Sequence, residues 1–203
     1  MKDFQIRQLL NRTELLKYHN DNESRVVEEL DIVVAKARID IAVINGSFHG
    51  YEIKGASDTL LRLPNQLIAY SYIFDYLTII TEEKYHKKVQ DLVPDWVAVY
   101  TCSKKSDQLV IKKEGSLNPH KNGFHLAQLL WREELFQVLD EFKIQYKKKY
   151  RNWILCEILS IHFDVNHLSD VVRTILKNRQ NWKIKSDCEV KSSDGFDYSE
   201  PKL

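Results

Sequence analysis

The chain has few cysteines, no long apolar run and no glycine-rich phosphate loop. Its three cysteines are far apart and form no CxxC pair, so we expect reduced, buried thiols and neither a zinc site nor a disulfide framework. No apolar run approaches the roughly 18 residues that a membrane-spanning helix needs. Neither GxxxxGKS nor GxGxxG occurs, and ATP-driven or dinucleotide chemistry therefore has no support.

A surplus of charge of one sign is also missing. The 203 residues include 30 Lys and Arg against 29 Asp and Glu, a net charge of +1. DNA-binding proteins usually carry a basic surplus, so any such surface here must be local. The first 20 residues read as an amphipathic helix interrupted by charges rather than a signal peptide. We expect a cytoplasmic protein with no membrane partner.

Residues 37–54 have the pattern of a β-hairpin. Two runs that alternate between β-branched and other residues flank an Asn-Gly-Ser turn at 45–47, which is a hairpin signal. A three-residue loop sets Asp40 opposite Glu52, so that both carboxylates share one face of the sheet. Lys54, two residues beyond Glu52, projects from the same face.

These charges could simply mark a solvated face, with Glu52 and Lys54 forming a surface ion pair worth under about 1 kcal/mol. The composition around them favours a buried sheet, because the neighbouring positions are almost all apolar, as in strands covered on both faces. The apolar neighbours are Ile39, Ile41, Val43, Ile44, Tyr51 and Ile53.

The chain resembles the PD-(D/E)xK nuclease superfamily in Asp40, in the Glu-Ile-Lys triplet at 52–54 and in a QxxxY segment at 66–70. The amino-acid sequence around these residues is similar to that of a group of short bacterial members. The resemblance covers about residues 23–100. Ile39 stands where the eponymous proline would be, a position that tolerates change. The resemblance implies an α/β fold with a restriction-endonuclease-like mixed β-sheet flanked by helices.

The chemistry of that superfamily suits these residue types. Mg²⁺ prefers oxygen ligands, keeps several waters and is commonly held by one or two carboxylates, a role that fits Asp40 and Glu52. The resemblance adds the backbone carbonyl of Ile53 as a third metal ligand. Such a metal, or Mn²⁺ in its place, activates a bound water. Lys54 would orient this water and stabilise the developing charge.

The resemblance also implies a helix with a further acidic residue before the hairpin. Residues 23–30 are expected to form it, with Glu28 and Glu29 as candidates. At about 100° per residue, Glu29 falls roughly 110° from the centre of the apolar arc and Glu28 roughly 150°. We therefore favour Glu29 as a ligand of the metal or its waters. The alternative is that both are exposed helix carboxylates.

A second helix is expected to begin near Pro64, since proline suits the first helical position. It places Gln66 and Tyr70 on one face. By resemblance, Gln66 would touch the catalytic lysine or the scissile phosphate, and the alternative for both side chains is a polar place at the edge of the core. Arg38 and Arg62 are candidate phosphate contacts.

Strand and helix patterns alternate up to about residue 112, and beyond about residue 124 only helical periodicity remains. The predicted elements are strands at 76–81, 96–101 and 109–112 and a helix at 82–92. The predicted parts are a nuclease-like α/β core (1–115), a helical C-terminal subdomain (116–185) and a disordered tail (186–203).

Two basic runs with interleaved aromatic residues lie in the helical part. They indicate either a footprint on the phosphate backbone or a solvated helix face. The first run is Lys143, Lys147, Lys148, Lys149 and Arg151, and the second is Arg173, Lys177, Arg179, Lys183 and Lys185.

Two classes of function remain. The first is a Mg²⁺-dependent nuclease, endo- or exonucleolytic, that hydrolyses phosphodiester bonds, with DNA preferred to RNA, in repair, restriction or defence against foreign DNA. The second is a non-catalytic nucleic-acid- or protein-binding module on a nuclease-like core. The joint presence of Asp40, Glu52 and Lys54 favours the first. A homodimer is compatible with it, because cutting two strands needs two cuts, but no residue indicates an interface.

Overall fold

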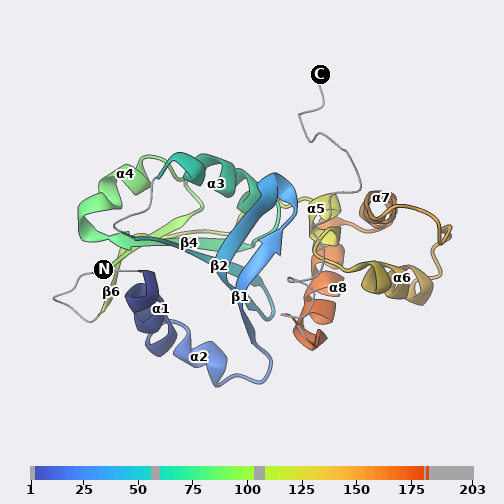
Figure 1. The fold of residues 1–203 in the computed structure, drawn as a ribbon, viewed down its shortest axis with the longest axis horizontal. Helices are drawn as coiled ribbons and strands as arrows, with labels where there is room; N and C mark the ends of the chain where they lie inside the picture. Colours follow the sequence, from blue (N-terminus) through green and yellow to red (C-terminus); the bar gives the residue numbers. More distant parts are fainter. Residues whose placement is uncertain (1–2, 56–59, 103–107, 181, 183–203) are drawn as a thin grey trace.

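The computed structural model describes residues 3–55, 60–102, 108–180 and 182. They form one mixed six-stranded sheet flanked by helices, followed by further helices, which confirms the predicted α/β class (Figure 1). The strands are β1 (Arg25–Ile32), β2 (Ala37–Ile44), β3 (Phe48–Lys54), β4 (Tyr76–Glu82), β5 (Ala98–Cys102) and β6 (Leu109–Lys113). The helices are α1 (Asp3–Arg12), α2 (Leu16–His19), α3 (Leu63–Ser71), α4 (His86–Gln90), α5 (Gly123–Ala127), α6 (Arg132–Glu141), α7 (Asn152–His162) and α8 (Val165–Asn178).

The order of the strands in the sheet follows the chain. β1, β2 and β3 are antiparallel, β3, β4 and β5 are parallel, and β6 returns antiparallel to β5. The two parallel connections contain α3 and α4, which cover one face of the sheet, while α1 covers the other (Figure 1). The strands predicted at 76–81, 96–101 and 109–112 correspond to β4, β5 and β6. The predicted helix at 82–92 is a 3-10 turn, Glu83–Tyr85, followed by α4.

The predicted hairpin is confirmed. The turn at 45–47 pairs Ile44 with Phe48, and the antiparallel pairing continues as far as Ile41 and Tyr51. It ends one position before the two predicted carboxylates, which therefore lie where β2 and β3 begin to separate.

The prediction of a helix at residues 23–30 is wrong, because the segment from residue 25 onward belongs to strand β1 (Arg25–Ile32). Val27 and Leu30 face the same core cluster at a spacing that imitates a helix. The cause is Glu29, whose φ of 54° interrupts the strand, so that the buried positions shift from Val27 to Leu30 and Ile32. Opposite Glu29, the side chains of β2 also switch faces of the sheet. Ile39 packs in the larger of the two hydrophobic clusters and Ile41 packs in the smaller one.

Two hydrophobic clusters form the core. The smaller lies under α1, where Ile6, Leu9 and Leu10 are fully buried against β2 and β3. The larger begins between α3 and the sheet and continues without a break into α5 to α8. The burial of apolar area on both faces stabilises this six-stranded sheet. The catalytic candidates on β2 and β3 are thus held between two packed layers.

A buried ion cluster also joins the sheet to the C-terminal helices. Asp75 is 4% exposed and accepts a hydrogen bond from the backbone N–H of Phe48 at 2.7 Å. Its carboxylate lies 2.5 Å from Lys121 Nζ and 3.6 Å from Arg173 Nη1. The predicted boundary at residue 115 falls between β6 and α5, and the predicted tail at 186–203 lies outside the described residues.

Cys102 and Cys156 are buried free thiols, as predicted, and burial raises their pKa to about 11 and about 12. Cys188 lies outside the described residues. None of the helices in the described ranges has the length and the apolar character to cross a membrane.

Candidate active site

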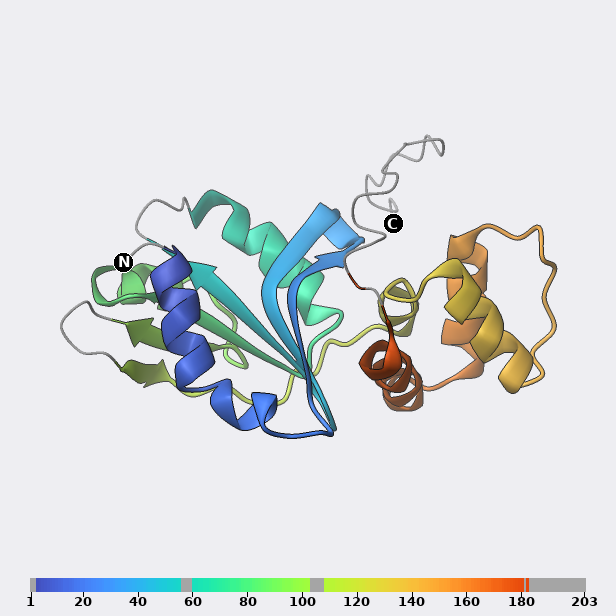
Figure 2. The same ribbon diagram turned by 60° about the horizontal axis from the view of Figure 1, so that its bottom comes forward.

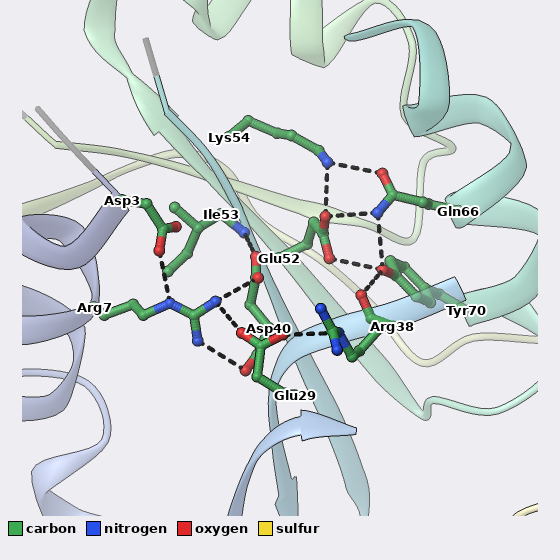
Figure 3. Close-up of polar contacts among 10 residues, drawn as sticks. All are labelled: Asp3, Arg7, Glu29, Arg38, Asp40, Glu52, Ile53, Lys54, Gln66 and Tyr70. Carbon is green, nitrogen blue, oxygen red and sulfur yellow. Dashed lines mark hydrogen bonds and ion pairs between the residues drawn. The ribbon is translucent and has the colours of Figure 1, made fainter. Parts of the chain in front are cut away.

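A cleft of about 700 Å³ opens where β2 and β3 separate, beside α1 and α3. All five predicted catalytic side chains contribute to its lining: Glu29, Asp40, Glu52, Lys54 and Gln66. Figure 3 shows ten side chains of this region and the polar contacts among them.

The Asp40 side chain accepts a hydrogen bond from the backbone of β3 at the point where β2 and β3 separate. Its Oδ2 accepts a hydrogen bond from the backbone N–H of Ile53 at 2.7 Å. A carboxylate here therefore satisfies a donor that the ladder between β2 and β3 no longer pairs. This contact holds Asp40 beside the strand that carries Glu52, as the hairpin register predicted.

Glu52 and Lys54 form a buried ion pair, since they are 3% and 4% exposed. Lys54 Nζ donates to Glu52 Oε1 at 2.7 Å and to Gln66 Oε1 at 2.7 Å. Gln66 Nε2 in turn donates to Glu52 Oε1 at 2.9 Å. The three side chains form a closed ring of hydrogen bonds, so each one fixes the orientation of the other two.

Tyr70 completes the surroundings of Glu52. Its hydroxyl donates to Glu52 Oε2 at 2.7 Å and lies 2.9 Å from the carbonyl oxygen of Arg38. Burial, and then the negative charge of Glu52, raise the pKa of this phenol. The helical spacing of Gln66 and Tyr70 predicted their common face. The buried residues Leu63 and Leu67 hold that face of α3 against the sheet.

Asp40 is the group with the most informative pKa. Burial and then the charge of Glu52 raise it to about 7, while the N–H of Ile53 and the guanidinium of Arg7 act in the opposite direction. Two buried carboxylates that raise a pKa by mutual repulsion are a frequent feature of functional sites. A cation between Asp40 and Glu52 would relieve that repulsion.

The oxygen ligands that this cleft offers fit a hard cation such as Mg²⁺ rather than zinc. Within the described residues, no group of three or more His, Cys, Asp or Glu side chains is arranged to hold a metal ion. Mg²⁺ can be bound by as few as one or two carboxylates with waters, which is what Asp40 and Glu52 offer. Ile53, the third predicted ligand, lines the same cleft.

Arg7 is a site residue that sequence reasoning missed. It projects from α1, with Nη2 lying 2.6 Å from Asp40 Oδ1 and 2.5 Å from Glu29 Oε1. Its Nε donates to Asp3 at 2.8 Å. Arg7 is one of several charges on an amphipathic helix, and no local pattern indicates which of them reaches a carboxylate 33 positions away.

Glu29 reaches the cleft from a strand and not from the predicted helix. The pairing of β1 with β2 places it opposite Asp40, and it pairs with Arg7 and, at 2.9 Å, with Arg38. Glu29 lines the cleft and Glu28 does not, so the preference for Glu29 agrees with its position. Its ion-pair partners are the two arginines, and among the described residues no hydrogen bond joins it to Lys54 or Glu52.

The predicted nucleic-acid contacts divide into two groups. Arg38 and Arg62 lie on the lining of the cleft. Lys147, Lys148 and Lys149 are exposed on the loop between α6 and α7, at the end of the molecule away from the sheet (Figure 2). The structure does not bring these lysines together with the cleft.

In the part that the structure describes, the basic residues of the second run form ion pairs within the molecule. Arg173 is buried against Asp75, and Lys177 pairs with Glu23 at 3.2 Å. Arg179 is buried between the rings of Trp131 and Trp182, 4.2 and 4.6 Å from their centroids, and pairs with Glu134. Arg173 and Arg179 thus serve internal packing, whereas Lys177 is partly exposed and pairs with an exposed carboxylate. Lys183 and Lys185 lie outside the described residues.

Comparisons with known proteins give one family. The family described as Bacteriophage P4 protein cII matches residues 5–194. Protein cII of Enterobacteria phage P4 is 27% identical over 160 residues, which cover 78% of this chain. The chain spans 60% of the length of that relative. A solved structure, the SPO1766 protein of unknown function from Silicibacter pomeroyi, has 13% identity and a TM-score of 0.35 over 72% of this chain and 78% of that one.

Proposed function

The chain belongs to the Bacteriophage P4 protein cII family, and we propose that it is a Mg²⁺-dependent nuclease that hydrolyses phosphodiester bonds, with DNA as the preferred substrate. The observation that carries the proposal is the meeting of Asp40, Glu52 and Lys54 at the separated end of one hairpin. Their order and spacing also resemble the PD-(D/E)xK superfamily.

Each side chain then has a chemical role. Asp40 and Glu52 would hold the cation, with the carbonyl of Ile53 as a further oxygen. A cation held there would lower the pKa of a bound water and offset charge on the phosphodiester. Lys54, whose ammonium is bound to Glu52, would hold the attacking water and stabilise the negative charge of the transition state. Gln66 keeps that ammonium in position.

The rim of the cleft suits an anionic substrate. Arg38 and Arg62 lie on the lining, and the side chain of Arg38 is 59% exposed although it pairs with Glu29. Exposed guanidinium groups bind phosphate oxygens with good geometry. They would position the nucleic-acid backbone without reading its bases.

A non-catalytic binding module remains the second candidate, and one contact favours it. Arg7 already neutralises Asp40, which is the arrangement expected where no metal is needed. In that case the buried carboxylates would serve the fold, and the cleft would bind its partner without cutting it.

The deciding experiment is a cleavage assay with single-stranded, double-stranded and branched DNA and with RNA, each with Mg²⁺, Mn²⁺ or EDTA. We expect cleavage with either metal, none in EDTA, and loss of cleavage in Glu52→Gln. Glu28→Gln is the matched control, because it makes the same change on an exposed strand position outside the cleft. Binding without cleavage by the wild type under all conditions supports the second candidate instead.

A further inference from the structure

Arg7 occupies the carboxylate that the proposed function assigns to the metal. Both oxygens of Asp40 are already engaged: Oδ2 accepts from the N–H of Ile53, and Oδ1 lies 2.6 Å from Arg7 Nη2. Arg7 Nη1 also donates to the backbone carbonyl of Asp40 at 3.1 Å (Figure 3). The guanidinium is thus bound to this residue through two separate groups.

A divalent cation cannot simply join this arrangement. The Asp40 oxygen free of backbone contacts is the one that Arg7 holds, so a metal bound there would lie next to a guanidinium. Two cations at such a separation repel each other strongly, the more so because the site is largely buried and poorly screened. One of them has to leave Asp40.

Arg7 has other anionic partners within reach. Its Nε already donates to Asp3, one helical turn earlier, and its Nη2 also contacts Glu29. Ile6, Leu9 and Leu10 are fully buried and anchor α1, so a change of the side-chain rotamer is enough and the helix need not undock. The Arg7 side chain is 17% exposed at the edge of the open cleft.

We propose that Arg7 is a built-in competitor of the metal. It neutralises Asp40 while no divalent cation is bound, and binding of the cation requires its transfer to Asp3 and Glu29. The proposal rests on the proposed function, because it assumes that Asp40 is a metal ligand. Under this proposal, α1 controls the metal affinity of the site, although this helix carries no residue of the predicted motif.

The test is a calorimetric titration of the full chain with Mn²⁺ alone, for the wild type and two variants. Arg7→Ala removes the cation that contacts Asp40. Arg38→Ala is the matched control, since it removes the same charge from the same cleft and the same partner, Glu29, but its side chain has no contact with Asp40. We expect Arg7→Ala to bind Mn²⁺ about 5- to 100-fold more tightly, the usual size of coupling between two ligands. Arg38→Ala should gain clearly less.

Arg7→Gln guards against failure of the alanine variant to fold, because it keeps a hydrogen-bond donor near Asp40 without the charge, and it should also bind Mn²⁺ more tightly. Equal or weaker Mn²⁺ affinity in folded Arg7 variants overturns the inference and leaves the nuclease proposal intact. An equal gain in Arg38→Ala also overturns it, because the effect is then one of general charge. Lack of Mn²⁺ binding in all the proteins removes the metal from Asp40 and overturns both proposals.

Discussion

The amide of Gln66 faces Lys54 with its oxygen, which accepts a hydrogen bond from Lys54 Nζ at 2.7 Å. The amide nitrogen donates to Glu52, so the amide cannot turn over without losing both contacts. Within the proposed function, this relationship makes Gln66 a positioning residue for the ammonium.

Replacing Gln66 should therefore reduce the rate of the chemical step. We expect Gln66→Ala to lower kcat for DNA cleavage by about 100-fold, with little change in KM, because misplacement of a reacting group by about 1 Å has an effect of that size. Asn65→Ala is the control, since Asn65 is exposed on the neighbouring position of α3 and also lines the cleft. An equal loss of kcat in both variants would mean that the rate depends on the integrity of α3 and not on the amide of Gln66.

Tyr70→Phe tests the hydroxyl that contacts Glu52. The change removes the hydroxyl, with its hydrogen bond to the buried carboxylate of Glu52 and its contacts with the Arg38 carbonyl and Gln66 Nε2, and leaves the ring in place. We expect the free energy of unfolding, measured by urea titration, to fall by about 1–3 kcal/mol. Tyr72→Phe should have a smaller effect, because Tyr72 is only partly buried and its contact is a ring stacked on His125. A Tyr70→Phe protein as stable as the wild type contradicts the contact.

The raised pKa of Asp40 predicts how metal binding depends on pH. A metal requires the ionised carboxylate, and burial and Glu52 raise the pKa of Asp40 to about 7. Mn²⁺ affinity should therefore weaken below that pH, approaching about tenfold for each pH unit lost. Titrations between about pH 5 and pH 8 check this. A constant affinity over that interval argues against Asp40 as a ligand.

The same group makes the metal-free fold depend on pH. Between the ordinary value of 3.8 and the folded value of about 7, the folded protein binds a proton that the unfolded chain does not. The contribution of Asp40 is therefore fully present below pH 3.8 and is lost as the pH rises through about 7. Urea titrations of Asp40→Asn should lack this component, and those of Asp95→Asn, an exposed position, should keep it.

The loop lysines carry a separate prediction about binding. We expect the triple change of Lys147, Lys148 and Lys149 to Ala to weaken binding to unrelated DNA sequences alike. It should lower the slope of log affinity against log salt by up to about 3, because each phosphate contact releases counterions. Cleavage at saturating DNA should survive, since the loop between α6 and α7 lies at the end of the molecule away from the sheet (Figure 2) and contributes no residue to the lining of the cleft. An unchanged slope would remove this loop from the DNA footprint.

Sequence reasoning predicted those parts of the fold and site that local rules determine. The length of the turn at 45–47 fixed the register that brings Asp40 and Glu52 together. The i, i+4 spacing on α3 fixed the common face of Gln66 and Tyr70. These features need only the geometry of one hairpin or one helix.

The parts that failed depend on the rest of the chain. The sequence pattern of β1 imitates a helix because the positive φ of Glu29 breaks the alternation of the strand, and no local residue pattern indicates that angle. Arg7 reaches Asp40 only because α1 packs across the sheet. Arg173 and Arg179 read as surface charges, yet tertiary packing buries them beside Asp75 and Glu134.

The shared core also limits how this chain can vary by recombination. Ile44 and Phe48, beside the turn between β2 and β3, belong to the same hydrophobic cluster as Leu126 and Val172 of the C-terminal helices. An unrelated helical segment exchanged after β6 would have to match this apolar surface and also supply the two cations that Asp75 needs. The helices are therefore not an interchangeable module, and descent should preserve them together with the hairpin.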